Sequence, residues 1–330
     1  MDLVDALKSK IDALEDGEHI LGLKAVLRHI ETAFSHLARG QKDDNESAFT
    51  DAIYRTNQAF EGSVKEAYRT MTGKDHSNTA PAKIEAYLEE KGLLRDRVLA
   101  QLTTYRREWR NPSTHDYKLD FDESESFLAI ISVSALACLL LDLIAERLAY
   151  VRSQTEAAAQ RDDIVASLAP TAGGDLHTRI TALLKEFCSS HIPVVPADSM
   201  LTETQAIGAL HGFLSSVAPE LNVATDVQIG PSGSPFRVDL MITQGDTTVA
   251  IELKRRITKA GYGTGIAQVH TYLLAGAVNS GVLLILPDSG GEVEMVDAID
   301  GASDGVGRVT AIVPSSALSK WQSQFPARVR

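Results

Sequence analysis

The sequence predicts an α+β protein of two domains, an all-helical bundle followed by an α/β domain with a mixed sheet. Three observations carry this prediction. The chain has 330 residues, whereas a single hydrophobic core rarely grows beyond about 250–300 residues. Apolar residues recur three and four apart through residues 1–150, which is the helical period. After residue 200 the pattern changes to helices that alternate with strand-like runs, which is typical of an α/β layout.

The first domain is expected to contain five helices. They are predicted at residues 20–40, 47–73, 81–92, 96–110 and 127–150. The fourth should end at Arg110, because the residue before a proline disfavours the helical region and Pro112 follows Asn111. The fifth has about the length of a membrane-spanning helix. Acidic residues crowd its start and Ser132, Ser134 and Asp142 interrupt it, so we interpret it as a buried core helix and not as a span.

The boundary between the domains is expected where the composition changes. Residues 153–200 are first alanine-rich and polar, then loop-like around Pro170 and Gly173, with a further amphipathic helix at 176–191. We therefore assign residues 1–152 to the helical domain, 153–200 to a linker with a connecting helix, and 201–330 to the α/β domain.

The second domain begins with a helix that Thr202 is suited to cap. In order, we expect a helix at 202–221, a strand at 223–230, a hairpin at 236–256, a helix at 265–277 and a buried strand at 281–288. The two strands of the hairpin should meet at Gly245–Asp246, a dipeptide that favours tight hairpin turns.

Charge and cysteine usage limit the class of protein. The formal net charge of −12 excludes nucleic-acid binding by a uniformly basic surface, so any such contact must be local or assisted by a metal. The two cysteines, Cys138 and Cys188, form no metal-binding pattern and fit a reducing compartment. The first residues contain no apolar signal core. We expect a cytoplasmic protein that does not associate with membranes.

The predicted hairpin carries residues suited to metal chemistry. Side chains two apart in a strand share a face, so Glu252 and Lys254 point together, away from the apolar face of their strand. Asp239 points away from the apolar face of the preceding strand and can lie beside Glu252. Carboxylate oxygens are the ligands that Mg²⁺ prefers. Such an ion, or Mn²⁺, activates water and neutralises phosphate charge, and the lysine can stabilise developing negative charge.

This arrangement of Asp, twelve residues and then Glu-Leu-Lys resembles the PD-(D/E)xK nuclease superfamily, which has the restriction-endonuclease-like fold. The resemblance covers residues 200–300 and includes a following helix with Gln268 and Tyr272 spaced one turn apart. It implies catalytic roles for Asp239, Glu252, Lys254, Gln268 and Tyr272.

The resemblance also implies an acidic metal ligand on the helix before the sheet, for which Glu203 is preferred over Glu220. Arg255 and Arg256 follow the motif and are expected to contact nucleic acid. One departure is that Arg237–Val238 stand where a proline would precede the aspartate.

A glycine-rich segment offers an alternative function. GYGTG at 261–265 precedes a predicted helix, and Asp288 follows at a strand end, as in dinucleotide-binding proteins. Its spacing is GxGxG, however, and not the GxGxxG of that fingerprint. We expect a flexible loop on the substrate side.

The stretch RNPSTHDY at 110–117 contains residues suited to a second kind of chemistry at phosphate. Arginine offers a planar fork for phosphate, and histidine exchanges protons near neutral pH. Arg110, Asn111 and His115 resemble the R-x(4–6)-H motif of HEPN domains (higher eukaryotes and prokaryotes nucleotide-binding), with Glu61 and Lys65 in an earlier matching helix.

The HEPN resemblance covers residues 15–150. It implies a homodimer in which two motifs share one cleft and cleave RNA without a metal. Arg106, Arg107 and Trp109 would then add phosphate and stacking contacts. Two alternatives stay open: a non-catalytic dimerisation or RNA-sensing module, and a plain helix-start signal at Pro112.

Taken together, these patterns predict a metal-dependent nuclease acting on DNA or RNA. Its N-terminal domain is expected to dimerise and is a candidate endoribonuclease. The family resemblances imply a prokaryotic effector of defence against phage or plasmids, with room for a further partner protein. The alternative is a non-catalytic nucleic-acid-sensing or dimerisation module with a degenerate nuclease site.

Overall fold

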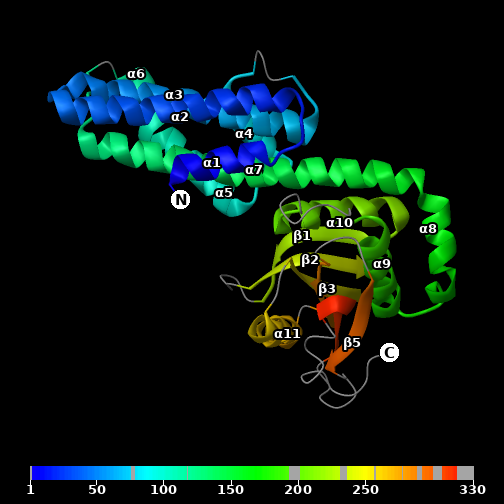
Figure 1. Ribbon diagram of the computed structural model, residues 1–330. Coiled ribbons are helices and arrows are strands. Elements are labelled where there is room, and N and C mark those ends of the chain that lie inside the picture. Colours follow the sequence, from blue (N-terminus) through cyan, green and yellow to red (C-terminus); the bar gives the residue numbers. More distant parts are fainter. Residues whose placement is uncertain are drawn as a thin grey trace. The chain divides into compact units, whose positions relative to one another are not determined.

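A computed structural model of the protein describes residues 2–75, 79–116, 118–192, 201–230, 236–255, 258–276, 278–287, 292–299 and 307–317. The chain divides into two compact units, Met1–Leu148 and Ala149–Arg330 (Figure 1). The prediction of a mostly helical first part followed by a mixed sheet is confirmed.

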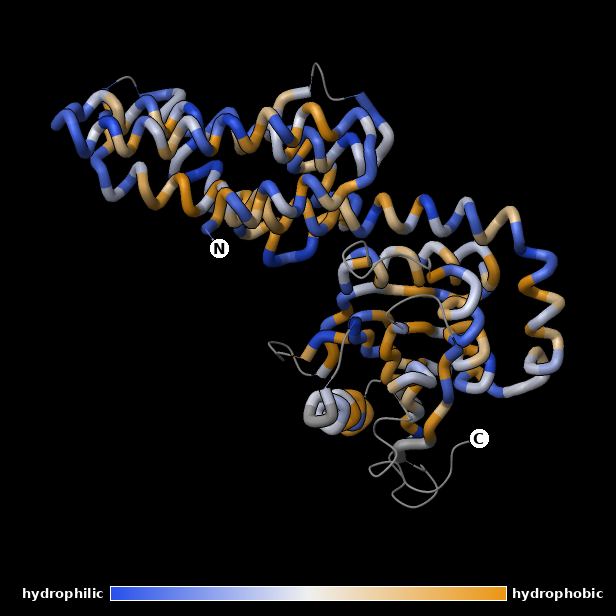
Figure 2. The backbone as a smooth tube through the Cα atoms, in the orientation of Figure 1, coloured by the Kyte–Doolittle hydropathy of each residue, from blue (hydrophilic) through white to orange (hydrophobic). Residues whose placement is uncertain are grey.

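The first unit is built from helices. They are α1 (Leu3–Asp12), α2 (Glu18–Asp43), α3 (Glu46–Thr72), α4 (Pro81–Glu90), α5 (Asp96–Tyr105), η1 (Arg106–Arg110), α6 (Asn111–His115) and α7 (Glu123–Ala159). In Figure 2 polar and apolar residues alternate along α2 and α3, which is the pattern of helices with one buried face. Their inward residues include Ile30 and Phe60, which are buried in the core of this unit.

The helix expected to end at Arg110 continues through Pro112. Residues Arg106–Arg110 form a π-helical turn, and the N–H of Asn111 donates to the carbonyl of Arg106, five residues earlier. A proline has no N–H to donate and its ring crowds the turn before it. The wider π turn makes room for that ring, so the helix resumes as α6. The predicted end at Arg110 is wrong for this reason.

The apolar helix α7 is the one helix in the described residues that is long and apolar enough to cross a membrane. Of its most apolar window, 56% is buried within the protein, which supports its interpretation as a core helix. Three of its polar residues have partners: Ser126 donates to the carbonyl of Phe49, Ser134 to that of Ile130, and Asp142 pairs with Lys10.

The segment expected to be a linker belongs to the second unit. α7 runs nine residues beyond its expected end at 150, because its alanines favour helix and Ala157 is fully buried. α8 (Arg161–Leu168), the short 3₁₀ turn η2 (Ala169–Thr171) and α9 (Leu176–Ser190) follow. The buried face of α9 contributes Ile180, Leu184 and Phe187 to the core beneath the sheet. Residues 153–192 therefore form part of a packed unit, and residues 193–200 lie outside the described residues.

The second unit is a six-stranded mixed sheet covered by helices. Its further elements are α10 (Glu203–Val217), β1 (Asn222–Gln228), β2 (Arg237–Gln244), β3 (Thr247–Lys254), α11 (Lys259–Leu274), β4 (Ser280–Ile285), β5 (Val293–Ile299) and β6 (Arg308–Pro314). The strand order is β1-β2-β3-β4-β6-β5. β3 pairs in parallel with β4, and β4 in parallel with β6. The pairs β1–β2, β2–β3 and β5–β6 are antiparallel.

Helices cover both faces of the sheet. Val249, Ile251 and Leu253 of β3 belong to the core shared with α9 and α10, whereas Ala250 packs with residues of α11. The hairpin turn lies where the sequence predicts it, with Gly245 in the left-handed region at φ 57°. β3 is therefore covered on both sides, and its polar residue Glu252 is buried.

The glycine-rich segment GYGTG, which was expected to be a loop, is helical. It lies in the first turns of α11, whose N-cap Thr258 accepts the N–H of Gly261. Tyr262 and Ile266 pack against the core on that side, and this tertiary contact offsets the low helix propensity of the glycines. β5 and β6 were not anticipated from the sequence.

Gly212 of α10 allows a close approach to α7. A Cβ atom at this position would lie 2.2 Å from the carbonyl oxygen of Tyr150. We expect Gly212→Ala to lower the free energy of unfolding by about 1–3 kcal/mol, because backbone must shift to relieve the overlap. Thermal or urea unfolding measures the change. Gly173→Ala is the matched control, since nothing lies within 4 Å of its added methyl group; equal stability of the two variants would contradict the prediction.

Candidate functional site

Glu252 and Lys254 form the centre of the candidate site at the C-terminal end of β3. Glu252 is only 2% exposed, and its Oε1 accepts a hydrogen bond of 2.6 Å from Lys254 Nζ. The same ammonium lies 3.7 Å from Oε1 of Glu203, in the first turn of α10. Burial by itself would lower the pKa of Lys254, but the hydrogen bond and charge of Glu252, with smaller effects of Asp239 and Glu203, raise it. Lys254 is therefore a firmly held cation among carboxylates.

Asp239 lies on β2 beside this pair. The ladder between β2 and β3 begins at Leu240↔Ile251, and beyond it the Asp239 side chain accepts the N–H of Leu253 at 2.8 Å. Burial, and then the charge of Glu252, raise the pKa of Asp239 to about 7, although Leu253 and Lys254 act in the opposite direction. The raised pKa reflects negative charge concentrated in a partly desolvated place.

α11 supplies the polar cover of Glu252. Tyr272 OH lies 2.8 Å from Glu252 Oε2 and also 2.8 Å from the carbonyl oxygen of Arg237. Because the hydroxyl has one proton, it donates to one of these acceptors at a time. Gln268 Nε2 donates to the same hydroxyl at 2.6 Å, so the two residues share one helix face, as their spacing predicts. Burial, and then the charge of Glu252, raise the pKa of Tyr272, which keeps it a donor.

The donor set was compared with what a divalent cation requires. Asp239, Glu252 and Glu203 offer the oxygen ligands that suit Mg²⁺ or Mn²⁺, and the pKa of Asp239 is raised by burial and then by the charge of Glu252. Within the described ranges, however, no three His, Cys, Asp or Glu side chains stand together closely enough to hold a metal ion. In this structure the ammonium of Lys254 lies between Glu252 and Glu203. The three carboxylates therefore have the chemistry of a Mg²⁺ or Mn²⁺ site, while the distances between Glu252 and Glu203 are those of two carboxylates on either side of the Lys254 ammonium.

Glu203 and Glu220, the two alternatives for the acidic helix residue, lie at opposite ends of α10. This 15-residue helix is about 22 Å long. Beyond its C-terminal end, Glu220 pairs with Arg179 of α9, which also donates to Gln244 at 2.8 Å. The structure thus brings Glu203, and not Glu220, to the candidate site.

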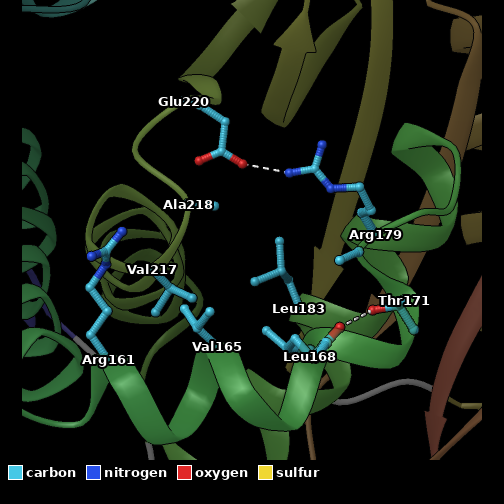
Figure 3. Close-up of a pocket in the computed structure, with 11 residues that line it drawn as sticks. Arg161, Val165, Leu168, Thr171, Arg179, Leu183, Val217, Ala218 and Glu220 are labelled. Atoms are coloured by element: carbon cyan, nitrogen blue, oxygen red, sulfur yellow. Dashed lines mark hydrogen bonds and ion pairs between the residues drawn. The ribbon is translucent and has the colours of Figure 1, made fainter.

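A cavity of about 350 Å³ lies beside Glu220 (Figure 3). Its apolar floor comes from α8, α9 and the end of α10, and includes Val165, Leu183 and Val217. Arg161 lines one side, where its Nε donates to the carbonyl of Ser216 and so satisfies the C-terminal end of α10. Of the residues considered for chemistry from the sequence, Glu220, the alternative to Glu203, lines this cavity.

One residue pair near the site was missed by sequence reasoning. Asp226 of β1 adopts a left-handed conformation at φ 52° and binds Arg237 Nε at 2.8 Å. It lies between the pairs Thr225↔Leu240 and Val227↔Val238, across from Asp239. A non-glycine residue in this region is uncommon, although aspartate is enriched there. No sequence signal marks it, since residue 226 sits in an ordinary strand-like run.

Two arginines, Arg255 and Arg256, follow β3 in the sequence. Arg255 Nε is buried and has no hydrogen-bond partner in the described part of the chain. Arg256 lies outside the described residues.

The N-terminal candidate motif lies on η1 and α6. Arg110 pairs with Glu61 of α3 at 3.3 Å, and its carbonyl accepts the hydroxyls of Ser113 and Thr114. His115 is exposed at the end of α6. Five residues correspond to about 140° around a helix, and no hydrogen bond joins Arg110 to His115 in the part of the chain that is described. Within one protomer, Arg110 is therefore paired with Glu61, and His115 is exposed without a bond to it.

The residues beside Arg110 have mixed roles. Asn111 accepts a hydrogen bond of 3.4 Å from Arg110. Arg106 pairs at 2.6 Å with the buried Glu85, so a phosphate would have to compete with that carboxylate. Trp109 packs against Phe121 with ring centroids 6.3 Å apart. Arg107 is exposed and accessible to a ligand.

The structure therefore brings the predicted nuclease residues together, whereas it leaves Arg110 and His115 of the N-terminal motif without a mutual hydrogen bond in the described part of the chain. Six predicted residues lie together at the end of β3: Glu203, Asp239, Glu252, Lys254, Gln268 and Tyr272. Arg110 and His115 lie on one short helical stretch, and no hydrogen bond joins them among the described residues. Comparisons with protein-family models, with curated proteins and with solved structures find no match to this chain.

Proposed function

We propose that the C-terminal unit is a metal-dependent nuclease that cleaves phosphodiester bonds of DNA or RNA. The observation that carries this proposal is the group of Asp239, Glu252 and Glu203 around the ammonium of Lys254 at the end of β3. Carboxylates and a lysine in one partly buried place suit catalysis at a phosphate. The PD-(D/E)xK resemblance and a role in defence against phage or plasmids belong to this proposal.

Mg²⁺ or Mn²⁺ at this site would supply Lewis-acid activation of water and charge neutralisation at phosphate. Asp239, Glu252 and Glu203 would hold the ion. Each oxygen of Glu252 already accepts one hydrogen bond, and a carboxylate oxygen has a second lone pair for a cation. Lys254, whose charge is secured by its neighbours, would stabilise negative charge developing on the phosphate.

The residues of α11 act through Glu252. Tyr272 donates to Glu252, and Gln268 donates to Tyr272, so both are positioning residues and not groups that touch substrate. Arg255, which follows β3, would contact a phosphate oxygen of the nucleic acid.

The test is cleavage of labelled double-stranded DNA, single-stranded DNA and RNA by the purified protein, with Mg²⁺, with Mn²⁺ or with EDTA. Cleavage that depends on the divalent ion supports the proposal. A specific observation favours the second candidate, a non-catalytic nucleic-acid-sensing module: the ammonium of Lys254 already lies between Glu252 and Glu203. Failure to cleave any substrate, together with no Mn²⁺ binding by calorimetry, would select that candidate.

For the N-terminal unit we propose pairing of two copies, which would bring two Arg110–His115 motifs together. Support comes from α7, where Phe127 and Leu128 are 50% and 54% exposed on an otherwise core-forming helix. Sedimentation of the full chain at micromolar concentration should give a dimer. Phe127→Glu with Leu128→Glu should shift it to monomer, and a wild-type monomer would refute the pairing.

A further inference from the structure

A group of cations lies on the seam between α2 and α3. It comprises Arg28, His29, His36 and Arg39 of α2 and Arg55 of α3, which we call the α2–α3 cationic face. The α2 members recur at helical spacing, so they share one side of that helix. In a chain of net charge −12, such a local excess of positive charge is a specific feature of this surface.

The acidic residue Asp51 neutralises only part of this charge. It accepts a hydrogen bond of 2.8 Å from Arg39 and lies 3.9 Å from His36. Arg55 donates to the neutral amide of Gln58 at 2.9 Å, which leaves its charge uncompensated by that contact. Asp51 is the one carboxylate that the described contacts place beside these cations.

Burial, and then the positive charge of the neighbouring arginines, lowers the pKa of both histidines. Burial, followed by the charges of Arg55 and Arg28, lowers the pKa of His29. Burial, followed by Arg39, lowers the pKa of His36; Asp51 opposes this shift and Arg55 adds to it. Both histidines are therefore neutral at neutral pH, and a bound polyanion would favour their protonation.

The cationic face lies next to the Arg110 site on α3. At about 100° per residue, Tyr54 falls between the side of α3 that carries Arg55 and the side that carries Glu61. Glu61 contacts Arg110. Tyr54 is 52% exposed, so an aromatic ring is presented between the two charged regions. In Figure 2 hydrophilic residues line the outward side of α2 and α3.

We propose that the α2–α3 cationic face binds the phosphate backbone of a single-stranded nucleic acid, with Tyr54 stacking on an unpaired base and the strand leading toward Arg110. Arginine suits phosphate oxygens, and exposed aromatic rings between cationic groups bind single strands by stacking on bases. A duplex offers no unstacked base to Tyr54, which selects single strands. The inference rests on the proposed action on nucleic acid and adds the surface that holds it.

The test measures binding without cleavage. Fluorescence anisotropy in EDTA follows a labelled single-stranded RNA of about 12 nucleotides bound to the full chain carrying His115→Ala. Arg28→Gln, Arg39→Gln and Arg55→Gln together should weaken binding about tenfold or more and lower the salt slope by about two, because three phosphate contacts are lost. Tyr54→Leu should weaken binding of single strands and leave duplex binding unchanged.

The matched control is Lys8→Gln with Lys83→Gln and Arg97→Gln, which removes the same charge from exposed positions of α1, α4 and α5. Circular dichroism and thermal unfolding establish that each variant is folded. Equal loss in the two triple variants, or no RNA binding by the parent, would overturn the inference. Metal-dependent cleavage is measured separately in the wild-type chain, so the nuclease proposal stands or falls independently of this surface.

Discussion

Glu252→Gln should reduce Mg²⁺-dependent cleavage by at least about a hundredfold, because it removes the charged ligand at the centre of the site. Glutamine keeps the volume of Glu252 and can still accept a hydrogen bond from Lys254 or Tyr272, which both contact the native carboxylate. The measurements are the cleavage rate at saturating Mg²⁺ and Mn²⁺ affinity by calorimetry. Both should fall while the unfolding temperature changes little.

The choice of glutamine follows from burial. The alternation of the sequence places Glu252 on the polar face of its strand. On a solvated face, alanine would be a harmless replacement because it would leave no cavity. The residue is 2% exposed, so alanine would leave a buried ammonium and hydroxyl without their acceptor. Asp246→Asn, in the turn at the other end of the hairpin, removes the same charge and should cleave at the wild-type rate. Full activity of purified Glu252→Gln would refute the assignment.

His115→Ala should abolish any RNA cleavage that persists in EDTA. In that reaction the ribose 2′-hydroxyl is the nucleophile, Arg110 supplies the charge for the phosphate and His115 transfers the proton, so no metal is needed. The products should carry 2′,3′-cyclic phosphates, which mass spectrometry of the cleaved ends detects. The cleavage rate should fall by about a hundredfold or more, within the range typical of general acid–base catalysis.

A reciprocal variant separates the two chemistries. Lys254→Met should lose Mg²⁺-dependent cleavage and keep the EDTA-resistant activity, whereas His115→Ala should do the reverse. Loss of both activities in either variant would contradict two independent sites. If the wild-type protein cuts no RNA in EDTA, the Arg110–His115 motif is not an active site in the isolated protein, and the dimerisation or sensing role of this unit is favoured.

Part of the candidate site was predictable because local rules specify it. A two-residue turn at Gly245 sets the register of the hairpin, and this register places Asp239 beside Glu252. Thr202 and Gln205 form the capping box that starts α10, which puts Glu203 in its first turn. These relations depend on residues that are near in sequence.

Other features depended on packing between distant segments. The sequence did not show that α11 covers β3, that Tyr272 therefore binds Glu252, or that Asp226 adopts a left-handed conformation across from Asp239. The strands β5 and β6 lie at one edge of the sheet and were missed. Each of these outcomes follows from which surfaces meet in three dimensions, and hydrophobic period carries no information about partners.

By itself the sequence determined a helical unit followed by a mixed sheet, and a hairpin that presents two carboxylates and a lysine. Only the tertiary structure decided that Lys254 lies between Glu252 and Glu203 and that Glu252 is buried beneath Tyr272. It also decided that Pro112 is accommodated inside a helix by a π turn, which leaves Arg110 paired with Glu61 and His115 exposed. The physical reason is the range of the interactions. Periodicity, caps and tight turns act over a few residues, whereas burial, pKa shifts and ion-pair partners depend on segments that only folding brings together.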